Sequence, residues 1–378
     1  MANTYLTRTP SSTGNRRILT ISCWFKRTNI SSTQTLFANG GNSYNRDYIS
    51  LESNQLVVAR YDGGYQYQIK LNRLFRDTNS WYHLMVAFNT TEDSSDNRIK
   101  IYINGVRETS FATNTRPSLN RDTWYNYSGK LQNIGVDYDN AGNDFDGLMS
   151  HVHWCDGAAL APTVFGETDS TTGEWKIKTS PSFTPGTNGF TILKDGNTIT
   201  DQSANSNNFS LGGGTLTNTK DCPSNVFATL NPLDVMKQSG GIYVPTFSNG
   251  NTTMSSSATN NYQTFGSIAV DTGKYYWEMK CPNGANGGLG SRIGLFHGDN
   301  KVHSGSYYYG PDGYNVHQNG SIYTNGSSTA YMAGFSNNII ITFALDKTNG
   351  KSYVGANGSW SDGNGNTNQS FANAVAVE

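Results

Sequence analysis

The sequence predicts an all-β protein built from two tandem antiparallel β-sandwiches. Short segments that alternate apolar and polar residues, or are apolar throughout, are separated by turns rich in glycine and asparagine. The chain has 378 residues, more than one sandwich needs, and 41 of them are glycine. Many short strands joined by tight turns fit these numbers.

Residues 81–111 contain the clearest strand signal. The run 81–88 is apolar on both faces, as a strand at the centre of a sandwich would be. The run 99–103 then has isoleucine at every second position, and Asn104-Gly105 follows it. Because a type I′ turn needs two positive φ angles, this dipeptide predicts a tight hairpin.

Further strands are expected on either side of this stretch. In the first half they lie at 19–26, 34–38, 48–51, 55–61 and 188–193. In the second half they lie at 274–280, 292–296, 312–323, 338–346 and 351–360. Between the halves, prolines and Gly240-Gly241 interrupt the pattern. We therefore predict a first domain over 1–220, a linker over 221–242 and a second domain over 243–378, which is cut short at 373–378.

Composition and charge exclude several functional classes. Charged residues make up 15% of the chain and the formal net charge is −1, so no overall field favours nucleic acid or an anionic membrane. No apolar run approaches the about 18 residues of a membrane span, and the first residues do not resemble a secretory signal. The four cysteines are far apart in sequence, which predicts free thiols or small buried side chains.

A loop rich in aspartate follows in the first half. Its four carboxylates are Asp137, Asp139, Asp144 and Asp146. Calcium takes about six to eight oxygen ligands, and oxygen-rich loops at the edge of a sandwich can hold it. Calcium is therefore the one candidate cofactor, with an ordinary polar turn as the alternative. His151 and His153 lie on one face of the next strand, where we expect exposed positions because no third metal ligand accompanies them.

Aromatic residues gather at three predicted turns. The candidate ligand-binding residues are Tyr61, Tyr65, Trp124, Tyr125, Tyr307, Tyr308, Tyr309 and Tyr314. Exposed rings on loops offer flat apolar area at low entropic cost, which suits the face of a sugar or a protein partner. The alternative is that individual rings pack into a sandwich. The 307–314 segment is the strongest candidate, because four tyrosines beside glycine and proline cannot all point inward.

Three motifs of the first half, in this order, resemble a known domain family. They are WYHL at 81–84, IKIYINGVRE at 99–108 and FDGLMSHVHW at 145–154. Together they are similar to the laminin-G/pentraxin-type domain of the concanavalin A-like superfamily, over roughly residues 15 to 215. The resemblance implies a two-sheet antiparallel jelly roll that binds a partner, often a glycan. Some members use calcium at the edge of the sandwich.

Motifs of the second half resemble a different domain. GKYYWEMK, IGLF, IIITFALD and ANGSW follow one another between 273 and 360, in an order similar to the SPRY domain. That resemblance implies a second β-sandwich that binds proteins through its loops. The pairing of the two domains, with the segments at 5–17, 166–169 and 228–234, resembles structural proteins of tailed bacteriophages. It implies a virion protein made in the host cytoplasm, whose partners are other virion proteins and a host-surface glycan or protein.

The sequence shows no arrangement of catalytic residues, and we predict that the chain is not an enzyme. Glycosidases need two carboxylates close together, and Glu167 with Asp169 is the nearest approach to such a pair. No G-x-S-x-G nucleophile elbow is present. We predict a tail-fibre, spike or capsid-fibre adhesin, which acts as a homo-oligomer because repeated weak sites raise avidity. The alternatives are an architectural decoration protein and a polysaccharide depolymerase.

Overall fold

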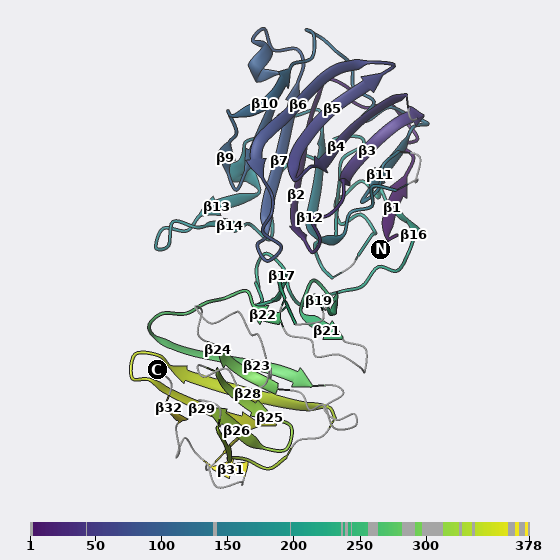
Figure 1. Ribbon diagram of the computed structural model, residues 1–378. Helices are drawn as coiled ribbons and strands as arrows, with labels where there is room; N and C mark the ends of the chain where they lie inside the picture. Colours follow the sequence, from purple (N-terminus) through teal and green to yellow (C-terminus); the bar gives the residue numbers. More distant parts are fainter. Residues whose placement is uncertain are drawn as a thin grey trace. The chain divides into compact units, whose positions relative to one another are not determined.

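The computed structural model is all-β, as the sequence predicts (Figure 1). It describes residues 3–42, 44–138, 142–196, 198–235, 237–238, 241–242, 244–255, 264–281, 292–296, 313–324, 327–334, 337–361, 367–369 and 375–376. Helical structure in these ranges is limited to two short 3-10 turns, Ser95–Asn97 and Pro162–Val164. None of these residues belongs to a helix that is long and apolar enough to span a membrane.

The chain divides into two compact units. Unit 1 comprises Met1–Pro232 and Phe247–Thr253, and unit 2 comprises Leu233–Thr246 and Met254–Glu378. The segment expected as a linker, 221–242, therefore begins inside unit 1. Its first residue, Asp221, is fully buried there in an ion pair with Lys26.

Unit 1 is a sandwich of two antiparallel sheets. The eight-stranded sheet has the order β10-β6-β5-β4-β3-β11-β1-β16. Its strands are β1 (Tyr5–Arg8), β3 (Gln34–Asn42), β4 (Asn45–Glu52), β5 (Gln55–Asp62), β6 (Tyr65–Leu74), β10 (Phe111–Thr115), β11 (Leu131–Ile134) and β16 (Ser210–Gly213). The six-stranded sheet, of order β15-β12-β2-β7-β8-β9, comprises β2 (Ile18–Arg27), β7 (Tyr82–Asn89), β8 (Ile99–Ile103), β9 (Val106–Arg107), β12 (Gly147–Asp156) and β15 (Phe190–Ile192).

The core of unit 1 lies between these two sheets. On β2, alternate residues from Leu19 to Phe25 are fully buried and belong to one large apolar cluster. β7 pairs with β2 on one side and with β8 on the other, which confirms the predicted central strand. The predicted hairpin also forms between β8 and β9, because Asn104 and Gly105 have φ angles of 49° and 77°.

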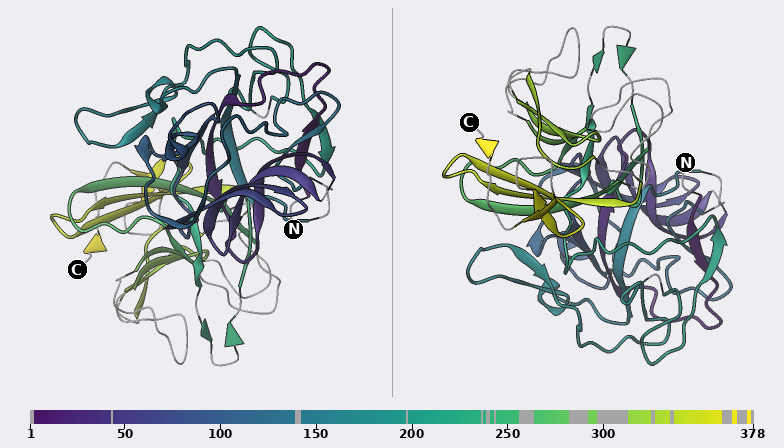
Figure 2. Two further views of the ribbon diagram at one scale, coloured as in Figure 1. Left: turned by 90° about the horizontal axis from the view of Figure 1, so that it is seen from above. Right: turned by 90° about the horizontal axis from the view of Figure 1, so that it is seen from below.

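A second hairpin, β13 (Gly166–Thr168) with β14 (Trp175–Ile177), projects from the sandwich (Figure 2). Its Trp175 ring lies against Gly105, where an added Cβ would approach the ring to 2.5 Å. Gly105→Ala should therefore lower the free energy of unfolding by more than about 1 kcal/mol, through both its positive φ and this clash. Urea unfolding measures the change. Gly173→Ala is the matched control, because its φ of 74° is similar and nothing lies within 4 Å.

The chain itself covers much of the outer face of the six-stranded sheet. Within the segment 157–183, Phe165 packs on Met85 and Ala87 of β7. On the eight-stranded sheet, the outer face carries a smaller buried cluster of Ala38, Tyr48, Val57 and Ala59. The candidate site described below lies at the turn between β5 and β6 of this eight-stranded sheet.

Unit 2 also contains two antiparallel sheets. One has the order β23-β28-β29-β30-β31 with β32 beside β29, and the other has the order β24-β25-β26-β27. Their strands are β23 (Lys274–Cys281), β24 (Arg292–Phe296), β25 (Gly313–His317), β26 (Ser321–Thr324), β27 (Ser327–Ala330), β28 (Ile339–Asp346), β29 (Lys351–Ala356), β30 (Ser359–Ser361), β31 (Thr367–Gln369) and β32 (Val375–Ala376). A buried cluster that includes Ile322, Ile341 and Phe343 joins the two sheets.

Short two-stranded ladders fill the region between residues 230 and 266. They join β17 (Leu230–Val235) to β22 (Thr264–Gly266), β18 (Lys237–Gln238) to β19 (Gly241–Ile242) and β20 (Thr246–Ser248) to β21 (Thr253–Ser255). All four cysteines are free, in agreement with their spacing in the sequence.

Candidate functional site

The turn between β5 and β6 places one carboxylate at the centre of a polar cluster. Asp62 ends β5, and Gly63 follows it with a φ of 67°. The Asp62 carboxylate accepts hydrogen bonds from Trp124 Nε1 at 2.9 Å and from Arg60 Nε at 2.6 Å. Arg121 Nη2 lies 3.4 Å from the same carboxylate. We call Arg60, Asp62, Arg121 and Trp124 the Asp62 rim.

A second, buried carboxylate anchors the rim from the core side. Asp47 has no exposed side-chain surface, and its Oδ2 lies 3.6 Å from Arg60 Nη1. It also accepts hydrogen bonds from the Tyr67 hydroxyl, at 2.5 Å, and from the Trp124 backbone N–H. Burial raises the pKa of the Asp47 carboxyl to about 6, although Arg60 opposes the shift. The Arg60 guanidinium is held between two carboxylates, which fixes the direction in which it donates.

Cationic side chains surround the Trp124 ring. Its centroid lies 5.2 Å from the guanidinium carbon of Arg60, 5.5 Å from Lys130 Nζ and 5.9 Å from the guanidinium carbon of Arg16. Arg16 also lies 4.1 Å from the ring centroid of Tyr127. The indole is half-buried, and its N–H is already donated to the rim carboxylate. These cation–π contacts hold the ring in one orientation at the surface.

A hollow of about 400 Å³ opens beside the rim, within the size range of small-molecule sites. It is lined by Arg60, Asp62, Ser118, Leu119, Asn120, Arg121 and Asp122. The two arginines and two aspartates cancel in formal charge, while the lining offers both hydrogen-bond donors and acceptors. Sugar hydroxyls donate and accept at the same time, so this lining suits a neutral polyol better than a ligand of one charge.

Two of the predicted aromatic groups lie close to the β5–β6 turn. The rings of Tyr61 and Tyr65 make an edge-on contact, with centroids 5.3 Å apart. Tyr65 is 50% exposed, and its hydroxyl lies 3.4 Å from the Tyr48 hydroxyl. Asp62 stands between the two tyrosines in the chain and binds Trp124. The sequence predicts the two groups separately, and the structure brings Trp124 to the turn that carries the two tyrosines.

Tyr125 is part of the core instead. Its side chain is 0% exposed, and its ring makes edge-on contacts with Trp154 and Phe88. The expectation that it binds a ligand at the surface is therefore wrong. The loop turns at Asn126, where φ is 57°, so neighbouring rings point to different sides. Of the remaining predicted residues, Tyr314 is half-buried on β25, and Tyr307, Tyr308 and Tyr309 lie outside the described residues.

In the described part of the aspartate-rich loop, carboxylates of the predicted calcium site have other partners. Asp137 Oδ1 lies 3.3 Å from Arg46 Nε, so an arginine already supplies the positive charge there. Asp146 Oδ1 accepts a hydrogen bond of 2.9 Å from a threonine hydroxyl. Across the described residues, no three histidine, cysteine or acidic side chains come together to hold a metal ion. Asp139 lies outside the described residues, so calcium binding by Asp137, Asp139, Asp144 and Asp146 stays a prediction.

His151 and His153 are buried, although the sequence predicts exposed positions. Their side chains are 5% and 2% exposed, because the segment 157–183 covers this face of the sheet. Next to them lies His83, which is fully buried. Burial lowers the pKa of His83 and of His153 to about 3, so both imidazoles are neutral in the folded chain.

Ser22 and His83 lie close together but do not form a catalytic pair. Ser22 Oγ is 2.9 Å from His83 Nε2, and both side chains are fully buried. Trp175 Nε1 donates to His83 Nδ1 at 3.1 Å, at the position where a catalytic triad has a carboxylate. This group connects the sheet to the β13–β14 hairpin.

Glu167 and Asp169 are also unsuited to acid–base catalysis. Both carboxylates lie within ion-pair distance of Lys176 Nζ, at 3.5 Å and 3.3 Å, on the projecting hairpin. Backbone N–H groups of Thr172 and Thr171 hold the pKa of the Asp169 carboxyl at about 2. A general acid needs a pKa near the working pH, so Asp169 cannot fill that role.

Comparison with known proteins identifies the domain that carries the Asp62 rim. A laminin G model of the concanavalin A-like lectin/glucanases superfamily matches residues 2–165. With the two-sheet arrangement, this match shows that unit 1 has the concanavalin A-like jelly-roll fold that the resemblance implies. The match ends at residue 165, so the SPRY-like second domain and the virion assignment stay predictions. No curated protein sequence matches the chain.

Solved structures with similar parts were also found. A heptameric pentraxin from Limulus polyphemus is 15% identical, covers 42% of this chain and 72% of its own, and has a TM-score of 0.32. A putative carbohydrate binding protein from Bacteroides ovatus is 15% identical, with 58% and 59% covered and a TM-score of 0.36. The enzymatically active domain of a bacteriophage CBA120 tailspike protein is 16% identical, with 42% and 25% covered and a TM-score of 0.30. These scores are low, so the domain assignment rests on the family match.

Sequence reasoning missed the charged members of the site. Arg60 and Arg121 lie next to residues that the aromatic pattern singles out, but each was indistinguishable from an ordinary surface arginine. The available signal was the dipeptide Arg121-Asp122 just before Trp124. Charged residues beside a loop tryptophan offer directional hydrogen bonds around an aromatic platform, which is a common composition for ligand sites.

Proposed function

We propose that the protein is a non-enzymatic adhesin that binds a glycan at the Asp62 rim of unit 1. One observation carries the proposal: the half-buried Trp124 ring and the fixed side chains of Arg60 and Asp62 lie beside a hollow whose charges cancel. Aromatic rings supply flat apolar area for the C–H face of a sugar, and the fixed arginine and aspartate groups supply directional bonds to its hydroxyls. The lectin family of the domain supports the same class of ligand.

We place this adhesin on a tailed-phage particle, because the sequence resembles structural proteins of tailed bacteriophages. There the protein is a tail-fibre, spike or capsid-fibre component, made in the host cytoplasm and displayed outside on the virion. Unit 2 is the SPRY-like sandwich that contacts other virion proteins, and its two antiparallel sheets support that interpretation. Several copies on one particle raise the avidity of weak sites.

A glycan array probed with the full chain tests the proposal. Binding to a defined class of glycan is expected, and Tyr65→Ala should weaken it about tenfold, because one exposed ring contributes roughly 1 to 1.5 kcal/mol. Arg121→Met should have a similar effect, because it removes a donor at the hollow. Tyr276→Ala is the matched control, since this tyrosine is 59% exposed on β23 of unit 2.

The second candidate is an architectural decoration protein that makes only virion contacts. The exposed side chains of Val226 and Phe227, at 60% and 40%, favour it, because apolar surface of this kind is common at protein contacts. Well-folded protein that binds no glycan on the array, and whose Tyr65→Ala variant no longer assembles into particles, would support the decoration protein and contradict the adhesin.

A further inference from the structure

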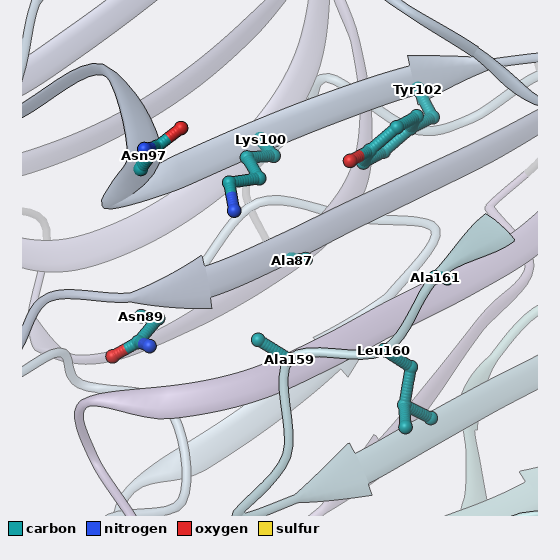
Figure 3. Close-up of a pocket in the computed structure, with 8 residues that line it drawn as sticks. All are labelled: Ala87, Asn89, Asn97, Lys100, Tyr102, Ala159, Leu160 and Ala161. Atoms are coloured by element: carbon teal, nitrogen blue, oxygen red, sulfur yellow. The ribbon is translucent and has the colours of Figure 1, made fainter. Parts of the chain in front are cut away.

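A small pocket opens on the outer face of the six-stranded sheet, on a different sheet from the Asp62 rim (Figure 3). Its volume is about 180 Å³. It is lined by Ala87, Asn89, Asn97, Lys100, Tyr102, Ala159, Leu160 and Ala161. The side chains of Lys100 and Tyr102 come from β8, and Figure 3 shows Ala159 and Leu160 on the other side of Ala87. The pocket therefore has one polar side and one apolar side.

The apolar side is fixed in place by a buried hydroxyl. Thr20 Oγ1 on β2 donates to the carbonyl oxygen of Ala158 at 2.8 Å and accepts from the Leu160 N–H at 2.9 Å. Ala87, opposite Lys100 in the sheet register, is small enough to leave space between them. The pocket is thus formed before any ligand arrives, which lowers the entropic cost of binding.

The polar side carries one positive charge without a partner. Within the described part of the chain, Lys100 has no ion pair and no hydrogen bond. Asn97 Oδ1 accepts a hydrogen bond of 3.1 Å from Arg107 Nη2, so the Asn97 amide group keeps its N–H bonds for a ligand. Asn89 Nδ2 donates to Glu92 Oε1 at 3.2 Å and its Oδ1 accepts from the Thr91 hydroxyl at 2.6 Å, so Asn89 keeps one N–H bond for a ligand. The pocket thus combines an ammonium group with oriented amides and the Tyr102 hydroxyl.

We propose that this pocket binds a single sugar residue that carries a carboxylate, such as a hexuronate. Its small volume, about 180 Å³, suits one ring better than a longer ligand. The carboxylate would lie on Lys100, the hydroxyls on the amides and Tyr102, and the C–H face on Leu160 and Ala159. The choice of a sugar rests on the proposed function, whereas the charge and the size come from the pocket alone.

A phosphate group fits the pocket less well. Sites for a dianion combine several cations or a row of backbone N–H groups. Lys100 is the single charged residue in the lining, and one ammonium group matches one carboxylate. Inorganic phosphate is therefore a useful competitor, and it should displace hexuronate only weakly.

Ligand-observed NMR titration of the full chain with D-glucuronate and D-glucose tests the proposal, because the two sugars differ only at the carboxylate. Glucuronate should bind roughly tenfold more tightly, as expected for a charged hydrogen bond. Lys100→Met should remove that preference, Lys100→Arg should retain it, and Ala159→Trp should block the pocket. Equal binding of both sugars, absence of glucuronate binding, or an unchanged preference in Lys100→Met would overturn the proposal.

The Tyr65→Ala variant separates this inference from the proposed function. It should lose array glycans and keep glucuronate binding, because it leaves the pocket untouched. If the array signal persists while glucuronate fails to bind, the inference fails and the proposed function stands. If glucuronate binding disappears in Tyr65→Ala but survives in Lys100→Met, the acidic sugar occupies the Asp62 rim and the pocket has no role.

Discussion

Asp221→Asn is expected to lower the free energy of unfolding of unit 1 by about 3 to 5 kcal/mol, because it leaves a buried ammonium group without its counter-charge. Lys26 Nζ lies 2.7 Å from Asp221 Oδ2, and both side chains are 0% exposed. The other carboxylate oxygen accepts a bond of 3.0 Å from Trp81 Nε1. Hydrogen exchange of β2 and β7 amides in urea reports unit 1 separately from unit 2.

Two further variants distinguish a buried ion pair from an ordinary one. Replacing both partners, as Lys26→Met with Asp221→Leu, should recover most of the lost stability, because no charge then stays buried. Lys176→Ala, which removes an exposed ion pair with Asp169, should leave the urea midpoint unchanged. If the free energy of unfolding of Asp221→Asn is within about 1 kcal/mol of that of the parent protein, the Lys26 ammonium group reaches water and the ion pair does not stabilise unit 1.

The local features of the fold were predictable from the sequence, and the long-range partners were not. The apolar run of β7 and the Asn104-Gly105 turn are set by residues next to each other, so periodicity and turn chemistry suffice. Asp221 pairs with a lysine 195 residues away, and nothing in its neighbourhood indicates burial. A linker was therefore expected where unit 1 continues.

For the candidate site, too, the residue types were predictable from the sequence and the long-range contacts were not. Tyr65 and Trp124 were predicted because loop aromatics stand out in composition. The contact of Trp124 with Asp62 joins residues 62 apart in the chain, which no sequence spacing reveals. The failure at Tyr125 has a similar cause, since burial depends on which side of the loop faces the core. Residue type predicted the chemistry, and only the fold determined which residues share a site.

The second large predicted effect is a loss of folding stability in acid, and it arises from His83 and His153. Both are neutral in the folded chain, with pKa values lowered to about 3 by burial, while an unfolded histidine titrates near its ordinary value of 6.5. The unfolded chain therefore takes up protons first as the pH falls. Their contribution to stability is complete above pH 6.5 and is lost progressively as the pH falls toward 3. From pH 7 to 5 the loss is about 2 kcal/mol for each histidine.

His83→Gln isolates one of the two contributions. Glutamine can donate to Ser22 and accept from Trp175, as the imidazole does, but it does not titrate. The difference in free energy of unfolding between pH 7 and 5 should therefore shrink by about 2 kcal/mol relative to the parent protein. A variant that keeps the full pH dependence would mean that His83 gains its proton without unfolding, through opening of the 157–183 cover. Hydrogen exchange at Trp175 would then increase in acid while the β2 amides stay protected, because only the cover would have separated from the sheet.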